Sequence, residues 1–369
     1  MKSSSYLSAV LFAAFASFGA NAAGAHSSDL KSYWLKDIDG NTMLDPQTSG
    51  LAVWRNGTLL TIADGSADDS QTMRIIQLDP NANQVLSPKV PISLAKDVSE
   101  SCFGGYLSGS PDLEAIAVDP KDDNIIYSVT EDASRYQWSS ECIDKYAGSG
   151  STEFPTVLVR IELQSDKAIM TGARPLQFAK EMNIGNHPND GIEGITFAGS
   201  HELYIALEKD DAGKARIFTV SLSDEFWKSS SYYPVTDANL ALPEFKKGNH
   251  PINALTYVPV ADSKGYLVAA ARNDNQLWFL DLERRKPVKV VQLNFLAESL
   301  SKDNGCKAFD QMHNYSIEGL AYDAGKVWLV NDPWKINYLN NVKCKANAEG
   351  YKRMSPLLTY IDVDFLTEE

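Results

Sequence analysis

The sequence predicts an all-β protein, and three observations support this class. One segment pattern recurs five times along the 369 residues. Each copy is followed by further short runs of apolar, β-branched and aromatic residues, which polar turns separate. Only four residues are cysteines, so a hydrophobic core rather than a disulfide framework must hold the chain together. We therefore expect β-sheets that are built from repeated units.

Each copy of the repeat begins with an oxygen-bearing residue, continues with a small residue and then forms an apolar strand. The five copies start at Ser49, Glu114, Glu193, Asn253 and Glu318. Second strands are expected at 58–62, 125–129, 203–207, 266–270 and 327–330. Third strands are expected at 74–78, 157–163, 216–222, 276–282 and 357–363. Fourth strands are expected at 90–94, 173–178, 232–237 and 288–295. Units of this kind predict propeller blades of four antiparallel strands.

The fifth unit lacks a fourth strand, because the chain ends soon after its third strand, near Phe365. The segment 32–38 precedes the first unit and has no other place in the pattern. We expect it to supply the missing strand, because a closed ring leaves no exposed sheet edge. The sequence thus predicts a five-bladed β-propeller closed by an N-terminal strand. The longer second unit leaves six blades as the alternative.

The N-terminus indicates the compartment. Lys2 is followed by an apolar run over 6–18 and by the small residues Ala20 and Ala22 around a cleavage site. This pattern predicts a signal peptide over 1–25, and its apolar core is too short to span a bilayer. We expect residues 26–369 to form a single propeller domain without membrane insertion. The protein should be periplasmic or secreted, where disulfides form.

Charge and motifs exclude several functions. With 34 basic and 48 acidic residues the formal net charge is −14, which argues against nucleic-acid binding. The sequence contains no Gly-x-Ser-x-Gly elbow, no P-loop and no zincin motif. A serine hydrolase of the usual α/β type and a P-loop enzyme are therefore unsupported.

The first residues of the five units predict a metal site. In a propeller the innermost strands line a central channel, so these residues should meet near one mouth of it. They are Ser49, Glu114, Glu193, Asn253 and Glu318, all with side-chain oxygens. Converging carboxylates repel unless a cation or protons lie between them. Oxygen ligands without His or Cys suit Ca²⁺. The alternative is that each residue only caps a strand in a wet channel.

The same mouth should collect further polar residues. Second strands end there at Glu208 and Lys209, at Arg272, and at Asp332 and Lys335; loops entering the innermost strands bring His187 and His250. We take His187, His250 and Glu208 as candidate general bases. Lys209, Arg272, Lys335 and Asp332 are candidate binding residues for a small anionic or ester substrate. The alternative is an ordinary charged rim.

The cysteines fall into two local pairs on this face. Cys102 and Cys142 flank the first two strands of the second unit, and Cys306 and Cys344 do the same in the fifth. Of the three connectivities that four cysteines allow, we prefer Cys102–Cys142 and Cys306–Cys344.

The repeat motifs also resemble a known family. Glu193-Gly194-Ile195-Thr196-Phe197 and Glu318-Gly319-Leu320-Ala321-Tyr322 resemble the secreted "esterase-like activity of phytase" propellers and the related SdiA-regulated bacterial propellers. This resemblance implies a calcium-containing propeller and suggests ester or phosphoester hydrolysis. The order Ser-Glu-Glu-Asn-Glu is more loosely similar to the calcium-activated nucleotidase (apyrase) propellers, which hold axial Ca²⁺. Asn253 stands where that family would place a Ser.

Two hypotheses follow. The first is a secreted calcium-dependent hydrolase of phosphate or carboxylic esters. The alternative is a non-enzymatic propeller that Ca²⁺ stabilises and that binds a glycan, a peptide or an envelope partner. Propellers host both kinds of function.

Overall fold

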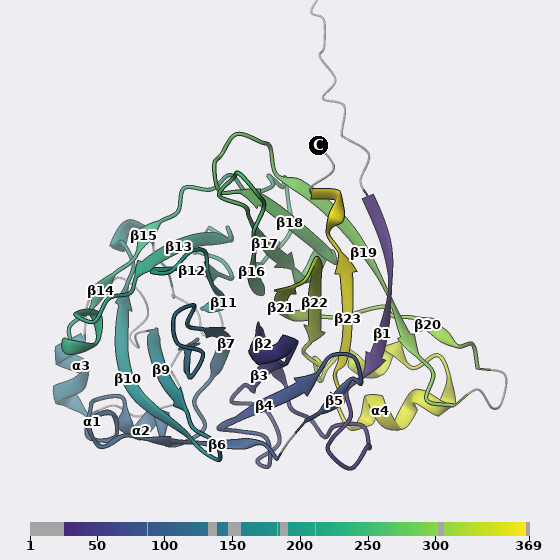
Figure 1. Cartoon of the computed structure of the whole chain (residues 1–369), viewed down its shortest axis with the longest axis horizontal. Helices are drawn as coiled ribbons and strands as arrows, with labels where there is room; N and C mark the ends of the chain where they lie inside the picture. The colour runs from purple at the N-terminus through teal and green to yellow at the C-terminus, as the bar shows by residue number, and fades with distance from the viewer. Residues whose placement is uncertain are drawn as a thin grey trace, which may run out of the picture.

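The strands of the protein are arranged around a central axis (Figure 1). The computed structural model describes residues 26–86, 88–131, 139–146, 156–182, 184, 191–210, 212–301 and 306–366. The predicted signal peptide at 1–25 lies outside these residues. Within them, no helix is long and apolar enough to cross a membrane.

The described strands form five groups, each of four strands joined by antiparallel pairing. The first group is β2 (Thr48–Val53), β3 (Leu59–Ala63), β4 (Arg74–Asp79) and β6 (Val90–Leu94). The second is β7 (Leu113–Val118), β8 (Ile125–Thr130), β9 (Val157–Leu163) and β10 (Ala168–Gln177). The third is β11 (Ile192–Phe197), β12 (Glu202–Leu207), β13 (Arg216–Ser221) and β15 (Thr236–Asp237). The fourth is β16 (Ala254–Val258), β17 (Tyr266–Ala271), β18 (Gln276–Asp281) and β19 (Lys289–Glu298). The fifth is β21 (Ile317–Asp323), β22 (Lys326–Asn331), β23 (Leu357–Asp362) and β1 (His26–Trp34).

The first strand of each group lies near the axis. β2 contacts β7 and β21, and β11 and β16 complete the circle of contacts. The small residue at the second position of each repeat allows the innermost strands of neighbouring groups to approach one another closely. A Cβ added to Gly194 would lie 2.8 Å from the backbone nitrogen of Leu255, and one added to Gly50 would lie 2.6 Å from that of Ile116. Both distances are shorter than contacts that Cβ atoms make, so the innermost strands meet through glycine.

The N-terminal strand joins two groups. Its Tyr33 and Trp34 pair antiparallel with Leu358 and Leu357 of β23, while residues 26–32 pair parallel with β19. β1 therefore begins and ends earlier than the expected strand at 32–38. Other outer strands also link neighbouring groups, since β10 pairs parallel with β6 and with the short β14 (Tyr233–Pro234).

The expected fourth strand at 232–237 is wrong in one respect, because the chain divides it between two groups. Tyr233 and Pro234 pair with β10, and Thr236 and Asp237 pair with β13. Pro234 has no N–H to donate to a continuous ladder. The remaining strands are β5 (Gln84–Val85) and β20 (Phe309–Gln311). The α-helices are α1 (Lys96–Ser99), α2 (Gly104–Leu107), α3 (Ser140–Tyr146) and α4 (Ala348–Lys352).

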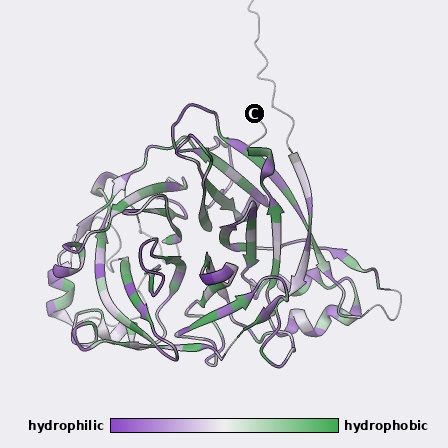
Figure 2. Cartoon of the chain, viewed as in Figure 1, coloured by the Kyte–Doolittle hydropathy of each residue, from purple (hydrophilic) through white to green (hydrophobic). Residues whose placement is uncertain are grey.

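The core lies between neighbouring groups and follows the strands, where apolar residues concentrate in Figure 2. Trp34 of β1 is 1% exposed, packs edge-on to Tyr351 and donates from Nε1 to the carbonyl of Glu298 at 2.8 Å. The N-terminal strand is thus tied to the fourth and fifth groups by packing as well as by its ladder. The result is a propeller-like all-β fold.

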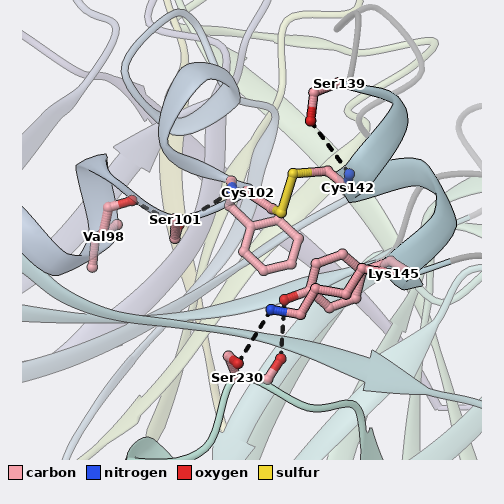
Figure 3. The surroundings of a disulfide bond; sticks show 9 residues. Val98, Ser101, Cys102, Ser139, Cys142, Lys145 and Ser230 are labelled. Carbon is pink, nitrogen blue, oxygen red and sulfur yellow. Dashed lines mark hydrogen bonds between the residues drawn. A yellow bond between two sulfur atoms is a disulfide. The ribbon is translucent and has the colours of Figure 1, made fainter.

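Both predicted disulfides are present, Cys102–Cys142 and Cys306–Cys344. The first lies beside α3, where Cys142 N donates to Ser139 Oγ at 3.3 Å (Figure 3). Two further contacts tie α3 to the loop before β14: Lys145 Nζ to Ser230 Oγ at 3.3 Å and Tyr146 Oη to the Ser230 carbonyl at 3.0 Å. The bridge therefore fixes a helix that also contacts the loop between β13 and β14.

We expect Gly194→Ala to lower the free energy of unfolding by about 2 kcal/mol, because the new methyl group forces β11 and β16 apart. Gly109→Ala is the control: the nearest atom to its added Cβ is at 3.5 Å, an ordinary contact. Chemical denaturation of both variants checks this. Equal stability of the two would contradict the close approach of the innermost strands.

We expect the double substitution Cys102→Ser and Cys142→Ser to lower the free energy of unfolding by about 3–4 kcal/mol. The bridge closes a loop with a sequence separation of 40. Its loss raises the conformational entropy of the unfolded chain, which stabilises the unfolded state. Denaturant melts with and without a reducing agent provide the measurement. The wild type should fall toward the variant on reduction, and an unchanged midpoint would argue against the bridge.

Candidate functional site

The glutamates at the centre are positioned by irregularities in the innermost strands. The β7–β8 register shifts between Leu113 and Ala115, the β11–β12 register between Ile192 and Gly194, and the β21–β22 register between Ile317 and Gly319. The extra residue is in each case the glutamate: Glu114, Glu193 or Glu318. A bulge leaves one residue unpaired and re-aims its side chain. These bulges were missed at the sequence level, where each glutamate was simply the first residue of a strand.

The structure brings the predicted ligands together. Ser49 Oγ donates to Glu114 Oε2 at 3.1 Å. Glu114 is close enough to Glu193, and Glu193 to Glu318, for each charge to act on its neighbour. Asn253 is fully buried, and neither polar atom of its side chain has a hydrogen-bond partner among the described residues. All five residues are at most 9% exposed.

More carboxylates join them from the ends of the second strands. Single oxygens of Glu131, Glu193 and Glu208 lie within 4.8 Å of one another. So do single oxygens of Asp64, Asp112 and Glu114. Asp112 was not predicted, although its place two residues before Glu114 could have suggested it. We call the whole set the mouth cluster; it consists of Asp64, Asp112, Glu114, Glu131, Glu193, Glu208, Glu318 and Asp332.

Burial and mutual repulsion raise the pKa of five of these carboxylic acids. Burial, together with the neighbouring carboxylates, raises the pKa of Glu114 and Glu193 well above its ordinary value. Burial also raises the pKa of Glu318, against the opposing effect of Arg272. The same causes raise the pKa of Asp64 to about 7 and that of Asp332 to about 8. The charged form of the cluster is therefore unstable unless a cation accompanies it.

Arg272 is the principal internal cation. Its guanidinium forms ion pairs with Glu318 and, at 3.2 Å, with Glu208. Although burial opposes its charge, the surrounding glutamates raise the pKa of Arg272 above its ordinary value. Lys209 lies 3.8 Å from Glu208, while Lys335 pairs with Asp45 at 3.1 Å. The eight carboxylates of the mouth cluster thus have three basic side chains near them. Two of these, Arg272 and Lys209, form a described ion pair with a member of the cluster.

The histidine candidates are placed differently. His250 Nδ1 lies 2.9 Å from both carboxylate oxygens of Asp274, and Nε2 lies 2.9 Å from the Lys247 carbonyl. Burial lowers the pKa of His250, but these hydrogen bonds outweigh it and raise the pKa. No contact of His250 with the mouth cluster occurs among the described residues. His187 lies outside them.

Sequence comparison identifies the family. The profile of the phytase-like family described as "Esterase-like activity of phytase" matches residues 47–333, well over half of the chain. The chain belongs to this family. The matched segment includes every residue from Ser49, the first predicted metal ligand, to Asp332, so it contains the entire mouth cluster.

Solved structures give weaker similarities. The PQQ-bound aldose sugar dehydrogenase of Streptomyces coelicolor is 11% identical, with 85% of this chain and 93% of that chain covered, at a TM-score of 0.35. A luciferin-regenerating enzyme is 9% identical, with 87% and 93% covered, at 0.42. A Bacteroides thetaiotaomicron protein of unknown function is 12% identical, with 87% and 71% covered, at 0.40. Such similarities say nothing about the substrate of this chain. No curated protein sequence matches it significantly.

In metal-free solution we expect the free energy of unfolding to fall as the pH rises from about 5 to about 8.5. An acid whose pKa is higher in the folded state binds its proton more tightly there. Its stabilisation is fully present below the unfolded pKa and is lost as the pH passes the folded values near 7 and 8 for Asp64 and Asp332. Denaturant melts across this range in EGTA measure the slope.

Asp332→Asn should flatten that slope, while Asp122→Asn, an exposed aspartate whose pKa is lowered by Asn124, should leave it unchanged. A stability that rises with pH in EGTA would contradict the raised pKa values.

Proposed function

We propose that this protein is a calcium-dependent hydrolase of phosphate or carboxylic esters, secreted or periplasmic, whose Ca²⁺ lies on the axis of a five-bladed propeller. In this proposal the five strand groups are the blades, and β1 completes the last one. The observation that carries the proposal is the mouth cluster, in which buried carboxylates outnumber the basic residues that contact them. The family supports hydrolysis, because esterase-like activity is its description.

The donor set fits Ca²⁺ better than a softer metal. The candidate ligands Ser49, Glu114, Glu193, Asn253 and Glu318 offer hydroxyl, carboxylate and amide oxygens, which Ca²⁺ prefers. Among the described residues, the groups that could hold an ion contain no His or Cys, which Zn²⁺ would favour. Buried oxygens without hydrogen-bond partners, Asn253 Oδ1, Glu318 Oε2 and Asp332 Oδ1, supply unused donor capacity at the same place.

The proposed chemistry divides among the residues of the mouth. The residues at the axis would hold Ca²⁺, which would supply Lewis-acid polarisation of an ester oxygen and a more acidic water. Glu208, a member of the mouth cluster, is the proposed general base that accepts the proton of the attacking water. Arg272 and Lys209, within reach of Glu208, are placed to neutralise negative charge that develops on the ester, and Asp332 and Lys335 would orient the substrate. Between the two histidine candidates, the occupied ring nitrogens of His250 make it the weaker choice.

Location outside the cytoplasm rests on two features. The N-terminal residues have the pattern of a signal peptide, and two disulfides brace the chain.

A second candidate function is a non-enzymatic, calcium-stabilised propeller that binds a glycan, a peptide or an envelope partner. Burial favours it: Glu193 and Glu318 are 7% and 5% exposed, as expected for an ion that plugs a channel. The ion pairs of Arg272 inside the cluster point the same way. In this case the mouth would hold an ion without an open coordination position.

The decisive experiment measures hydrolysis of 4-nitrophenyl phosphate and 4-nitrophenyl butyrate with Ca²⁺ and with EGTA. Melting temperatures are recorded in parallel. We expect Ca²⁺ to be required for turnover and to stabilise the fold, by about 2.7 kcal/mol at a hundredfold excess over Kd. Glu193→Gln should weaken both effects, because it removes a charged ligand, while the exposed Glu100→Gln should change neither.

The outcomes separate the two functions. Calcium-dependent stability without turnover on either substrate favours the binding protein. A melting temperature that EGTA leaves unchanged contradicts the axial Ca²⁺.

A further inference from the structure

A cavity of about 590 Å³ lies beside the mouth, apart from the carboxylates. Three segments enclose it: the loop after β12 around Lys214, the loop 242–250 before β16, and Trp278 of β18. The first follows Glu208 and the second leads to Asn253, so the cavity opens between the third and fourth groups on the side of the mouth cluster. Its volume is within the range of small-molecule sites.

The walls of the cavity combine an aromatic face with an apolar floor. Phe245 is 40% exposed although it is a large apolar side chain. Its ring stacks on His250 with centroids 3.6 Å apart and an interplanar angle of 13°. Trp278, 1% exposed, and Leu242 also line the cavity, and the Trp278 ring centroid lies 5.7 Å from that of Phe245 at an interplanar angle of 32°. One face of Phe245 is thus fixed by His250.

The loop that carries Phe245 is held in place. His250 is anchored by Asp274 and by the Lys247 carbonyl, each at 2.9 Å. Gly248 has φ = +113°, and a Cβ there would lie 2.6 Å from His250 Nε2, so only glycine fits the turn. The aromatic face is therefore preformed rather than assembled by a ligand.

The cavity is also basic within an acidic protein. Lys214, Lys246 and Lys247 line it, and among the described residues of its lining Glu244 is the one acidic side chain. No described residue forms an ion pair with any of these three lysines, whereas Lys209, Lys228 and Lys335 on the same chain do pair with carboxylates. Unpaired lysines around a fixed ring, in a chain of net charge −14, concentrate positive potential at one place.

We propose that this cavity binds a small anion that carries a ring with an apolar face, such as an aryl phosphate or a sugar phosphate. The ring of the ligand packs against Phe245, and its anionic group contacts Lys214 and Lys246. The site takes its ligand without the metal of the mouth cluster, and it goes beyond the proposed hydrolase activity.

Calorimetric titration of the full chain in EGTA tests the site with three probes: phenyl phosphate, glucose 6-phosphate and inorganic phosphate. We expect both ring-bearing probes to bind more tightly than inorganic phosphate. The double variant Lys214→Gln, Lys246→Gln should raise Kd for all three by about tenfold. Phe245→Ala should raise Kd for the ring-bearing probes alone. Stronger binding of phenyl phosphate or of glucose 6-phosphate tells an aromatic from a sugar ligand.

A matched control carries the same change in net charge elsewhere: Lys167→Gln with Lys264→Gln, two exposed lysines outside the cavity. It should bind like the wild type, and equal melting temperatures confirm that the variants fold. Unchanged Kd in both cavity variants, or no binding of any probe in EGTA, would overturn the proposal. Because titration in EGTA excludes calcium-dependent turnover, a failed hydrolase assay leaves this result intact, and a failed titration leaves the hydrolase intact.

Discussion

The repulsion between buried carboxylates at the axis is the constraint on which the rest of this structure depends. The five innermost strands pack closely through the small residue of each repeat. The residue that precedes it, the first of each repeat, is therefore brought to the axis. Three of these residues are glutamates, and the ends of the second strands add more. In a buried site such charges cannot all remain ionised alone. Protons, Arg272 or a bound cation must compensate their negative charge. Which of the three does so determines the charge and the reactivity of the mouth.

Arg272 shows how the fold handles this repulsion by itself. Its ion pairs to Glu318 and Glu208 link the fourth group to the fifth and the third. One guanidinium cannot neutralise eight carboxylates, however. The repulsion that remains contributes to the raised pKa values of Asp64 and Asp332. A divalent cation would displace protons from these groups, so metal binding and proton release are coupled. In our proposal the same residues therefore determine both the stability of the fold and the activity at the mouth.

The fold was largely predictable because its signals are local. The repeat and its strands, and the pairing of Cys102 with Cys142, follow from spacing and periodicity. The bulges at Glu114, Glu193 and Glu318 were not predictable, since a bulge depends on the register of the partner strand. The pairing of His250 with Asp274 was missed because it joins two loops of different strands. The division of 232–237 between two groups likewise depends on neighbours that no local pattern reveals.

The distribution of basic residues adds a final step to the argument. The lysines and arginine near the carboxylates are engaged in ion pairs, so they compensate charge within the protein. The lysines around Phe245 have no such partner among the described residues, and the preformed loop keeps them beside an exposed ring. The chain as a whole is acidic, but the unpaired lysines make the potential at this cavity positive. Anions are therefore attracted to the cavity and not to the axis, where carboxylates predominate. In the two proposals the sites on this face therefore differ in sign: the axis would hold a cation, and the neighbouring cavity would bind an anion.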